Sequence, residues 1–202
     1  MKKIFLKFIS FLPFLKVVAN TRGSQTPVNF THLIWQKLLG LNRKAYWPVH
    51  FTSIVTHPNN IYAGIDTSPG YSPGCYIQGK GKIHVGDYTQ IAPNVGIISS
   101  NHDLYDNSKH ILGKVIIGKY CWIGMGALIM PGVELGNFTI VGAGSVVTKS
   151  FSEGYCVIAG NPARLIKKID KTKCVEHKNT KEYNGFFPKE QFDKLIKNTI
   201  NI

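Results

Sequence analysis

Branched aliphatic residues recur at every sixth position through the middle of the chain. Six consecutive units run from Ile117 to Val147, and three more precede them from Val85 to Ile97. The residue two positions earlier is small or β-branched in each unit, and residues two apart on a strand face the same side. Each unit therefore points two side chains inward. The aliphatic positions are Val85, Ile91, Ile97, Ile117, Ile123, Ile129, Leu135, Val141 and Val147.

A period of six residues accommodates one short strand and one corner, with no room for a helix. Three units make a triangular coil in which positions eighteen apart stack, for example Ile117 over Leu135. Each buried branched aliphatic side chain contributes about 1.5–3 kcal/mol, and burial accumulates from coil to coil. An ordinary antiparallel sandwich would not keep this register. Glycine often follows the aliphatic position, and we expect it to supply unusual φ angles at the corners: Gly86, Gly118, Gly124, Gly136 and Gly142.

The repeat is interrupted once, between Ile97 and Ile117, where twenty positions stand in place of six. Within this interval, residues 99–113 read SSNHDLYDNSKHILG and carry two histidines, two aspartates and a tyrosine. The rest of the repeat is poor in such groups. Because function is often placed on polar loops held by a rigid scaffold, we expect this segment to protrude and to carry the chemistry.

The charge of the chain narrows its partners. A formal charge of +13 over 202 residues attracts nucleic acid, anionic membranes or phosphorylated small molecules, and it is also compatible with a simple solubility margin. Nucleic acid is disfavoured because the basic residues crowd at the two ends and no nucleic-acid motif stands out. The four cysteines lack metal or disulfide spacing, which is typical of reduced thiols in a cytoplasmic protein: Cys75, Cys121, Cys156 and Cys174.

Composition divides the chain into three regions. Residues 1–50 form an N-terminal helical segment, with a helix predicted around Thr31 to Leu39. Residues 51–164 form the β-helix, and residues 165–202 form a basic tail that we expect to be helical over 188–198 because a proline stands at its first turn. The 44% apolar fraction suffices for a buried core.

The first residues, MKKIFLKFISFLPFLKVV, combine a basic start with an apolar run, as a signal peptide does. Lys7, Lys16 and Pro13 interrupt that run, and no cleavage site follows. The segment is too short and too charged for a membrane span. Two alternatives stay open: peripheral membrane contact through residues 1–20, and a helix packed on the protein's own surface.

The chain carries five short motifs: NHD at 101–103, WIG at 122–124, PGV at 131–133, VGAGSVVTK at 141–149 and GNPAR at 160–164. Together with the repeat, these motifs resemble those of the hexapeptide-repeat acyltransferases over about residues 75–168. The resemblance is greatest to the maltose and galactoside O-acetyltransferases and to the sugar O-acetyltransferases of bacterial capsule and O-antigen synthesis. It implies a left-handed parallel β-helix, a homotrimer, and acetyl-CoA bound in the groove between subunits without a metal.

The resemblance places the catalytic histidine of the family on the protruding loop, at His102. Independently, a sugar hydroxyl needs a base to attack a thioester, and a histidine pKa near about 6.5 suits that task. Backbone N–H groups at glycine-rich corners can stabilise the oxyanion, and Asp103 is a candidate to orient the imidazole. The family's cofactor contacts carry over onto Met125, Ala143, Thr148, Lys149, Arg164 and Lys167, the basic ones meeting phosphates of CoA.

The acceptor site is predicted just before the regular coils, from Tyr71, Tyr76 and Gln78. Here the chain departs from the maltose and galactoside enzymes, whose acidic substrate ligands lack counterparts. Lys80 and Lys82 stand in that stretch instead. A phosphorylated or lipid-diphosphate-linked saccharide therefore suits this region better than a free neutral sugar.

The main hypothesis is acetyl transfer to a saccharide hydroxyl in cell-surface polysaccharide assembly. The alternative is N-acetylation of a nucleotide-linked amino sugar. A metal-dependent carbonic anhydrase on a similar β-helix would need three converging histidines, but His84, His102 and His110 have the wrong spacing. A non-catalytic scaffold is the remaining hypothesis. Cys121 is interpreted as a core residue, whereas Trp122 either packs against CoA or covers the outside of the coil.

Overall fold

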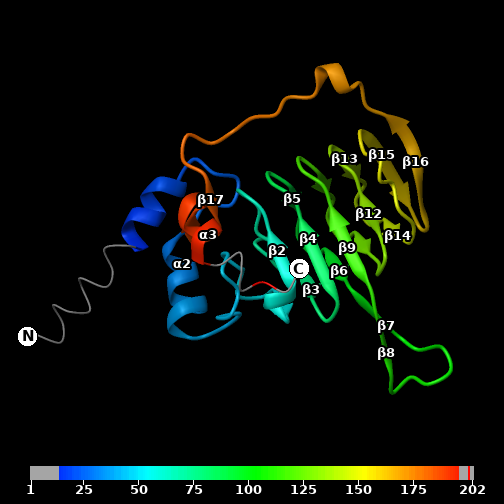
Figure 1. Cartoon of the computed structure of the whole chain (residues 1–202), viewed down its shortest axis with the longest axis horizontal. Helices are drawn as coiled ribbons and strands as arrows, with labels where there is room; N and C mark the ends of the chain where they lie inside the picture. The colour runs from blue at the N-terminus through cyan, green and yellow to red at the C-terminus, as the bar shows by residue number, and fades with distance from the viewer. Residues whose placement is uncertain (1–13, 196–199, 201–202) are drawn as a thin grey trace, which may run out of the picture.

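The computed structural model describes residues 14–195 and residue 200. Its strands form a triangular coil of three sheets, with helices at one end (Figure 1). Sheet A contains β1 (Ile54–Thr56), β3 (Tyr76–Gln78), β6 (Gly96–Ile98), β11 (Leu128–Ile129) and β14 (Val146–Val147). Sheet B contains β2 (Ile61–Ala63), β4 (Lys82–Val85), β9 (Lys114–Ile117) and β12 (Glu134–Leu135). Sheet C contains β5 (Gln90–Ile91), β10 (Trp122–Ile123), β13 (Thr139–Val141), β15 (Cys156–Gly160) and β16 (Ala163–Lys168).

The register of the coil follows the six-residue repeat. Within the six units that follow the hairpin, strands pair in parallel with partners eighteen residues apart, including Ile117 with Leu135 and Ile123 with Val141, as predicted. All nine repeat aliphatics are at most 9% exposed, and the nine residues two positions earlier are at most 2% exposed. The core therefore runs continuously through the coil, and the sequence prediction of its inward positions is confirmed.

The glycines that follow the aliphatic positions have a different role from the one predicted. They do not have positive φ, and the left-handed backbone lies two residues later, as at Gly126 and Tyr120. The glycines are required because successive coils touch there. A Cβ on Gly136 would lie 2.3 Å from the carbonyl oxygen of Ser152. The prediction of unusual φ at these glycines was therefore wrong, because contact between coils and not turn geometry excludes a side chain.

The N-terminal region closes one end of the coil. It contains a helix over 14–21, α2 (Phe30–His32), the π-helical turn η1 (Leu33–Leu38) and the 3-10 turn η2 (Pro58–Asn60). Trp47 is fully buried, and its indole N–H donates to the Pro69 carbonyl. The predicted helix around residues 31–39 is confirmed. Within the described residues, none of the helices has the length and hydropathy to cross a bilayer, and residues 1–13 lie outside that range.

The C-terminal region turns back along the coil after β16. It comprises η3 (Lys171–Lys173), β17 (Tyr183–Asn184), β18 (Phe187–Pro188) and α3 (Lys189–Leu195), whose Phe192 ring packs against Tyr46 at the helical end of the coil (Figure 1). A column of stacked rings at one corner of the coil lies under this segment, which is anchored where the Tyr120 hydroxyl donates to the His177 carbonyl. Much of the tail is therefore extended where it lies along the stacked rings. The helix expected near residue 188 is α3.

Candidate functional site

The segment that interrupts the repeat forms a hairpin that projects from the coil (Figure 1). Its arms are β7 (Ser100–His102) and β8 (His110–Leu112), paired antiparallel. The side-chain oxygen of Gln78 accepts hydrogen bonds from both the amide and the hydroxyl of Ser100, at 3.0 and 2.8 Å. The hairpin therefore leaves a rigid strand of sheet A with its first residue fixed.

His102 lies at the end of the first arm, directly across from His110. The two rings are 4.2 Å apart between centroids. The Nδ1 atom of His102 is 2.6 Å from the carbonyl oxygen of Asn107. Because a carbonyl oxygen only accepts hydrogen bonds, Nδ1 carries the proton in this arrangement and Nε2 of the neutral ring keeps a free lone pair. An exposed imidazole held in this tautomer is suited to accept a proton from an acceptor hydroxyl.

Asp103 acts on the turn of the hairpin. Its carboxylate accepts hydrogen bonds from the backbone amides of Tyr105 and Asp106, at 2.9 and 3.0 Å. These bonds fix the turn that presents the Asn107 carbonyl. The hydrogen-bond partner of the imidazole is thus the Asn107 backbone carbonyl, whereas Asp103, the candidate to orient the ring, bonds to the amides of the turn.

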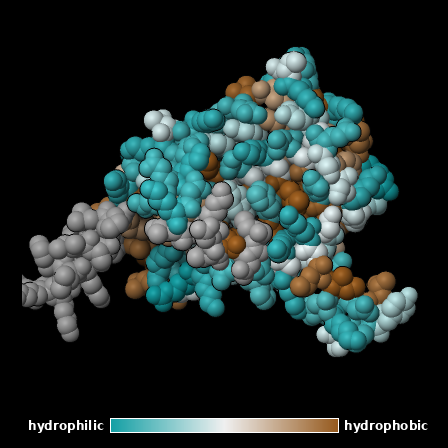
Figure 2. All heavy atoms as spheres, viewed as in Figure 1, coloured by the Kyte–Doolittle hydropathy of each residue, from teal (hydrophilic) through white to brown (hydrophobic). Residues whose placement is uncertain are grey.

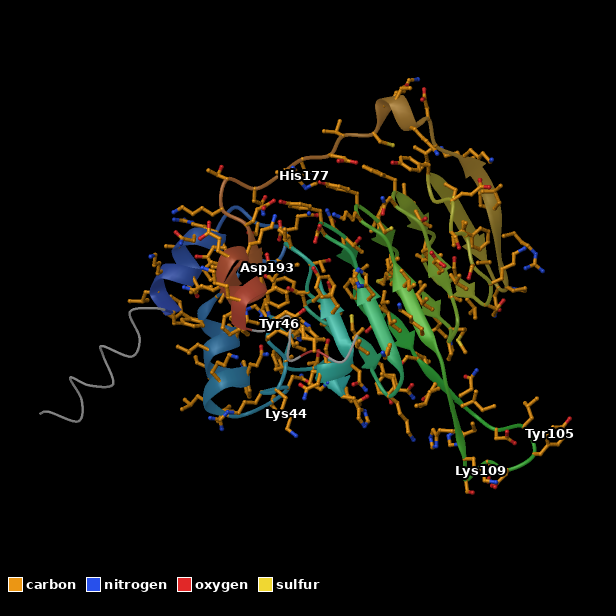
Figure 3. The ribbon with its side chains drawn as sticks, in the orientation of Figure 1. Lys44, Tyr46, Tyr105, Lys109, His177 and Asp193 are labelled. Atoms are coloured by element: carbon orange, nitrogen blue, oxygen red, sulfur yellow. The ribbon has the colours of Figure 1, made fainter. Side chains whose placement is uncertain are left out.

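The tip of the hairpin makes little contact with the rest of the protein. Figure 3 shows Tyr105 and Lys109 there, pointing away from the sheets. Tyr105 is 98% exposed and Leu104 is 90% exposed, and Figure 2 shows other apolar side chains of the loop at the surface. Exposed apolar groups of this size mark a contact surface.

A basic cavity of about 680 Å³ lies at the foot of the hairpin. Lys80, Lys82 and Lys114 line it, with Lys82 and Lys114 side by side on paired strands of sheet B. Among the described residues, no carboxylate lies within ion-pair distance of these three ammonium groups. Partial desolvation, the charge of Lys80 and the neighbouring His102 together lower the pKa of His110. The cavity therefore carries uncompensated positive charge beside the histidine pair.

The residues predicted to contact CoA occupy two corners and the last strand of the coil. Met125 and Ala143 lie on the same corner of successive coils, where the Gly144 amide donates to the Met125 carbonyl at 2.8 Å. Thr148 and Lys149 follow β14, on the corner from which the hairpin also departs. All four are exposed. The outer face of sheet A separates these two corners.

Arg164 and Lys167 lie on β16, paired opposite Ala159 and Val157 of β15. Both side chains are exposed, and the Arg164 guanidinium also donates to the Ala163 carbonyl at 3.3 Å. The turn that precedes them carries a cis peptide bond between Asn161 and Pro162. The two charges therefore lie at the last coil, where sheet C ends.

Residues predicted for the acceptor site separate in the structure. Gln78 reaches the hairpin, and Tyr76, two residues earlier on β3, is 41% exposed on the outer face of sheet A. Tyr71 lies away from them, with its hydroxyl donating to the Pro27 carbonyl at 3.1 Å and its ring against His32. The structure brings only Gln78 into direct contact with the hairpin.

The neighbouring residues Cys121 and Trp122 point to opposite sides of sheet C. Cys121 is 2% exposed, and burial raises the pKa of its thiol to about 11, so its interpretation as a core residue is confirmed. Trp122 points outward from sheet C and is 55% exposed. Sequence reasoning missed Asn107, because the role of a carbonyl depends on the shape of the turn and not on its side chain.

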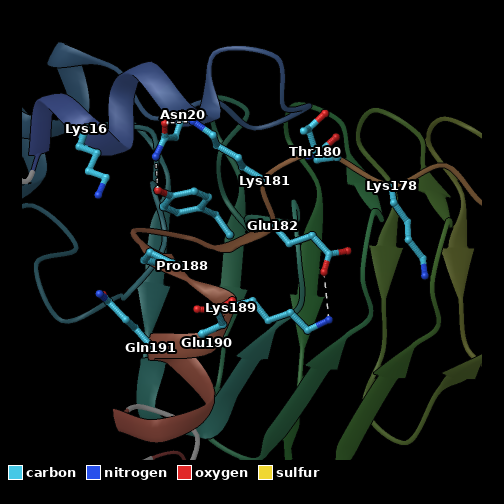
Figure 4. Close-up of a pocket in the computed structure, with 12 residues that line it drawn as sticks. Lys16, Asn20, Lys178, Thr180, Lys181, Glu182, Pro188, Lys189, Glu190 and Gln191 are labelled. Atoms are coloured by element: carbon cyan, nitrogen blue, oxygen red, sulfur yellow. Dashed lines mark hydrogen bonds and ion pairs between the residues drawn. The ribbon is translucent and has the colours of Figure 1, made fainter.

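Another cavity, of about 610 Å³, lies between the helix over 14–21 and α3 (Figure 4), at the end of the protein opposite the hairpin. Its walls include Lys16, Lys178 and Lys181, and the Glu182 carboxylate there pairs with Lys189 at 3.0 Å. Among the described residues, no cluster of three or more metal-ligating His, Cys, Asp or Glu side chains is found. The hairpin remains the place where reactive groups and an unpaired basic cavity meet.

Comparison with known proteins reveals consistent similarities. Residues 114–149 match the family described as bacterial transferase hexapeptide (six repeats). A 63-residue segment is 42% identical to nodulation protein L of Rhizobium meliloti (strain 1021), covering 29% of this chain and 34% of that protein. The chain thus spans about a third of the length of this relative.

Solved structures extend the likeness over most of the chain. A maltose O-acetyltransferase from Clostridium difficile 630 is 31% identical, with 67% of this chain and 76% of that chain covered and a TM-score of 0.56. A galactoside acetyltransferase in complex with coenzyme A is 25% identical, with 72% and 76% covered and a TM-score of 0.60. The predicted fold, a mainly β left-handed parallel β-helix of hexapeptide repeats, is confirmed by these likenesses together with the parallel sheets.

Proposed function

Because this chain belongs to the hexapeptide-repeat acetyltransferase family, we propose that it transfers the acetyl group of acetyl-CoA to a hydroxyl of a saccharide. The observation that carries this proposal is the imidazole of His102, exposed on a braced hairpin with Nδ1 held by the Asn107 carbonyl. That arrangement leaves Nε2 as the proton acceptor. The biological setting that we propose is cell-surface polysaccharide assembly, such as capsule or O-antigen synthesis, in the cytoplasm.

The chemistry proceeds by direct transfer. Nε2 of His102 takes the proton of the acceptor hydroxyl while its oxygen bonds to the thioester carbonyl carbon. The resulting oxyanion is stabilised by backbone N–H groups at the corners of the coil. Its collapse breaks the carbon–sulfur bond, and the departing thiolate takes the proton from the imidazolium. The products are an acetyl ester and CoA, with His102 returned to its neutral form.

The site is completed in a homotrimer. His102 stands on a hairpin that projects from its own coil, and the tip residues Leu104 and Tyr105 are almost fully exposed. A second wall for the reacting groups must then come from a neighbouring protomer. In this arrangement acetyl-CoA lies in the groove between subunits against the predicted contacts: Met125, Ala143, Thr148, Lys149, Arg164 and Lys167. The three basic residues among them suit the phosphates of CoA.

The acceptor that we propose carries phosphate, as a phosphorylated or lipid-diphosphate-linked saccharide. Lys80, Lys82 and Lys114 line one cavity at the foot of the hairpin, with no carboxylate paired to them within the described part of the chain. Three adjacent unpaired ammonium groups favour a multiply charged anion. Gln78, beside the hairpin, and Tyr76, on the outer face of sheet A, are the residues that we propose for the sugar, whereas the Tyr71 hydroxyl already has a backbone partner.

A transfer assay tests the reaction. Purified protein is incubated with acetyl-CoA and a panel of saccharides that offer either hydroxyl or amino acceptors, while thiol release and product mass are followed. We expect an alkali-labile acetyl ester. An alkali-stable amide on a nucleotide-linked amino sugar would establish the N-acetyltransferase alternative, and thiol release that no acceptor accelerates would refute acetyl transfer.

A second assay tests the acceptor class by comparing each saccharide with its phosphorylated form. We expect Lys82→Gln to raise KM for the phosphorylated acceptor about tenfold, since one charge-assisted contact is lost, and to leave kcat nearly unchanged. Lys109→Gln is the matched control, because that lysine lies on the hairpin outside the cavity and pairs with Asp106. Equal KM values for both acceptor forms in the unmodified protein would contradict a phosphate-bearing acceptor.

A further inference from the structure

The helical segment formed by α2 and η1 buries polar side chains and exposes apolar ones. Its inward face carries His32 and Gln36, which are 5% and 0% exposed. The Gln36 amide donates to the carbonyls of Ala45 and Trp47, and its oxygen accepts from the Val49 amide. A buried glutamine with all its polar atoms satisfied fixes the orientation of this helix. The polar side therefore faces the protein, and the opposite side must face outward.

The outward side is apolar. Leu38 is 76% exposed and Leu39 is 58% exposed, and Trp35 stacks on Phe51 at 4.9 Å between ring centroids. Isolated exposed apolar residues are ordinary, but a group on one helix marks an interaction surface. We call this group the outer helical surface; it consists of Phe30, Ile34, Trp35, Leu38, Leu39, Leu41 and Phe51, each at least 37% exposed.

The chain segment that carries this surface has charges of one sign. The first 65 residues contain eight lysines and arginines and no aspartate or glutamate, so that Asp66 is the first acidic residue of the chain. Lys37 lies within the helical segment, and Arg43 and Lys44 follow it with exposed side chains. The sequence of residues 1–13, MKKIFLKFISFLP, has the same combination of lysine and apolar residues.

We propose that the outer helical surface docks on an anionic lipid bilayer. Leucine, isoleucine, tryptophan and phenylalanine on one face with lysine and arginine beside them are the composition of interfacial helices. Anionic headgroups attract basic segments next to the membrane. A second copy meeting this surface with the same surface would bring only like charges together, because the segment has no carboxylate.

The geometry suits a protein that works at a membrane. The outer helical surface and the hairpin with His102 lie at opposite ends of the molecule (Figure 1). Docking through the helix therefore leaves the hairpin free. The proposed contact surface is formed by residues 30–51, outside residues 1–20, for which the sequence left membrane contact as one of two alternatives. The docking does not depend on which reaction the hairpin catalyses.

Vesicle flotation with the full chain tests the docking. Vesicles of phosphatidylcholine alone are compared with vesicles of phosphatidylcholine and phosphatidylglycerol, at low and at high salt. We expect recovery with the anionic vesicles only, weakened by salt. Leu38→Glu should lower the partition coefficient about tenfold or more, since it replaces an inserted apolar side chain with a charge.

Val175→Glu is the matched control, because Val175 is also an exposed apolar residue, at 73%, on the C-terminal segment. It should float as the unmodified protein does, and circular dichroism verifies that both variants are folded. Equal flotation of Leu38→Glu and unmodified protein would overturn the proposal. So would a Leu38→Glu variant that changes oligomeric mass without lipid, since that outcome assigns the surface to a second copy. Acetyl transfer to a soluble acceptor should be unchanged in Leu38→Glu, which separates this test from that of the catalytic proposal.

Discussion

The coil and the hairpin that interrupts it treat apolar side chains in opposite ways. In the coil, Ile123 and its repeat partners are completely buried between stacked strands. In the hairpin, Leu104 and Tyr105 are almost completely exposed, although the segment that carries them follows β6 of sheet A in the same coil. The coil buries its apolar side chains within one protomer, whereas the hairpin leaves its apolar side chains exposed for contact with another molecule.

This difference separates stability from chemistry. Substitutions in the coil should change the free energy of unfolding and leave the reacting groups in place as long as the protein folds. Substitutions in the hairpin should change turnover and leave unfolding almost unaffected, because few contacts link its tip to the core. Three predictions test whether the separation holds, and another tests the packing of the N-terminal region that closes the coil.

The largest effect is expected from His102→Ala. Removal of the general base should lower kcat by about 10²–10⁴-fold, while the free energy of unfolding changes by less than about 0.5 kcal/mol, as is usual for exposed positions. Steady-state kinetics and urea unfolding give the two values. Lys109→Ala, also on the hairpin, should leave both unchanged. A kcat near that of the unmodified protein would remove His102 from the mechanism.

Ile123→Ala should produce the complementary result in the coil. The substitution leaves a cavity in a fully buried stack and should cost about 2–5 kcal/mol of unfolding free energy. Ile111→Ala, at a residue of the hairpin that is 53% exposed, is the matched control and should cost little. If both substitutions destabilised the protein equally, the hairpin would be part of the core and the comparison would fail.

Acidification should lower the stability of the folded protein through the buried side chain of His32. Burial and the nearby His50 lower the pKa of His32 from 6.5 to about 4. Between these values the unfolded chain binds a proton at His32 that the folded protein does not. Stability should therefore fall as the pH drops from about 6.5 toward 4, by up to about 3 kcal/mol. Urea unfolding at pH 7 and pH 5 measures the loss, and a His32→Gln variant with the same pH dependence would exclude this source.

The smallest effect is expected from Asp103→Ala. Loss of the two turn hydrogen bonds should loosen the Asn107 carbonyl that holds His102, which lowers kcat about fivefold for roughly 1 kcal/mol of lost restraint. Asp103→Asn should restore most of the activity, because an amide oxygen still accepts from the Tyr105 and Asp106 amides. If Asp103→Asn were as slow as Asp103→Ala, the charge of Asp103 would be acting directly on the imidazole.

The six-residue repeat allowed the coil to be predicted from the sequence. Each unit contributes one strand and one corner, so the inward positions at Ile117, Ile123 and Ile129 follow from spacing alone. The single break in register likewise located the hairpin and His102. These features are local and periodic, and a periodic signal repeats the same information in every unit.

Contacts between segments distant in the sequence could not be predicted from such a repeat. The glycines at the corners are required by the close approach of successive coils, and the Asn107 carbonyl meets His102 only through the shape of the turn. Tyr71 packs under the N-terminal segment, away from the hairpin that its place in the sequence suggested. The outward apolar face of α2 and η1 depends on the hydrogen bonds of Gln36 to four backbone groups in the loop that follows.

The sequence by itself thus determined the coil, its core and the place of its one interruption, because these depend on which side of a strand a residue faces. Only the tertiary structure decided the partner of His102, the reason for the corner glycines and the surface that the N-terminal helix presents. Those depend on how closely separate segments approach one another, and the spacing of residues within one segment does not determine that distance.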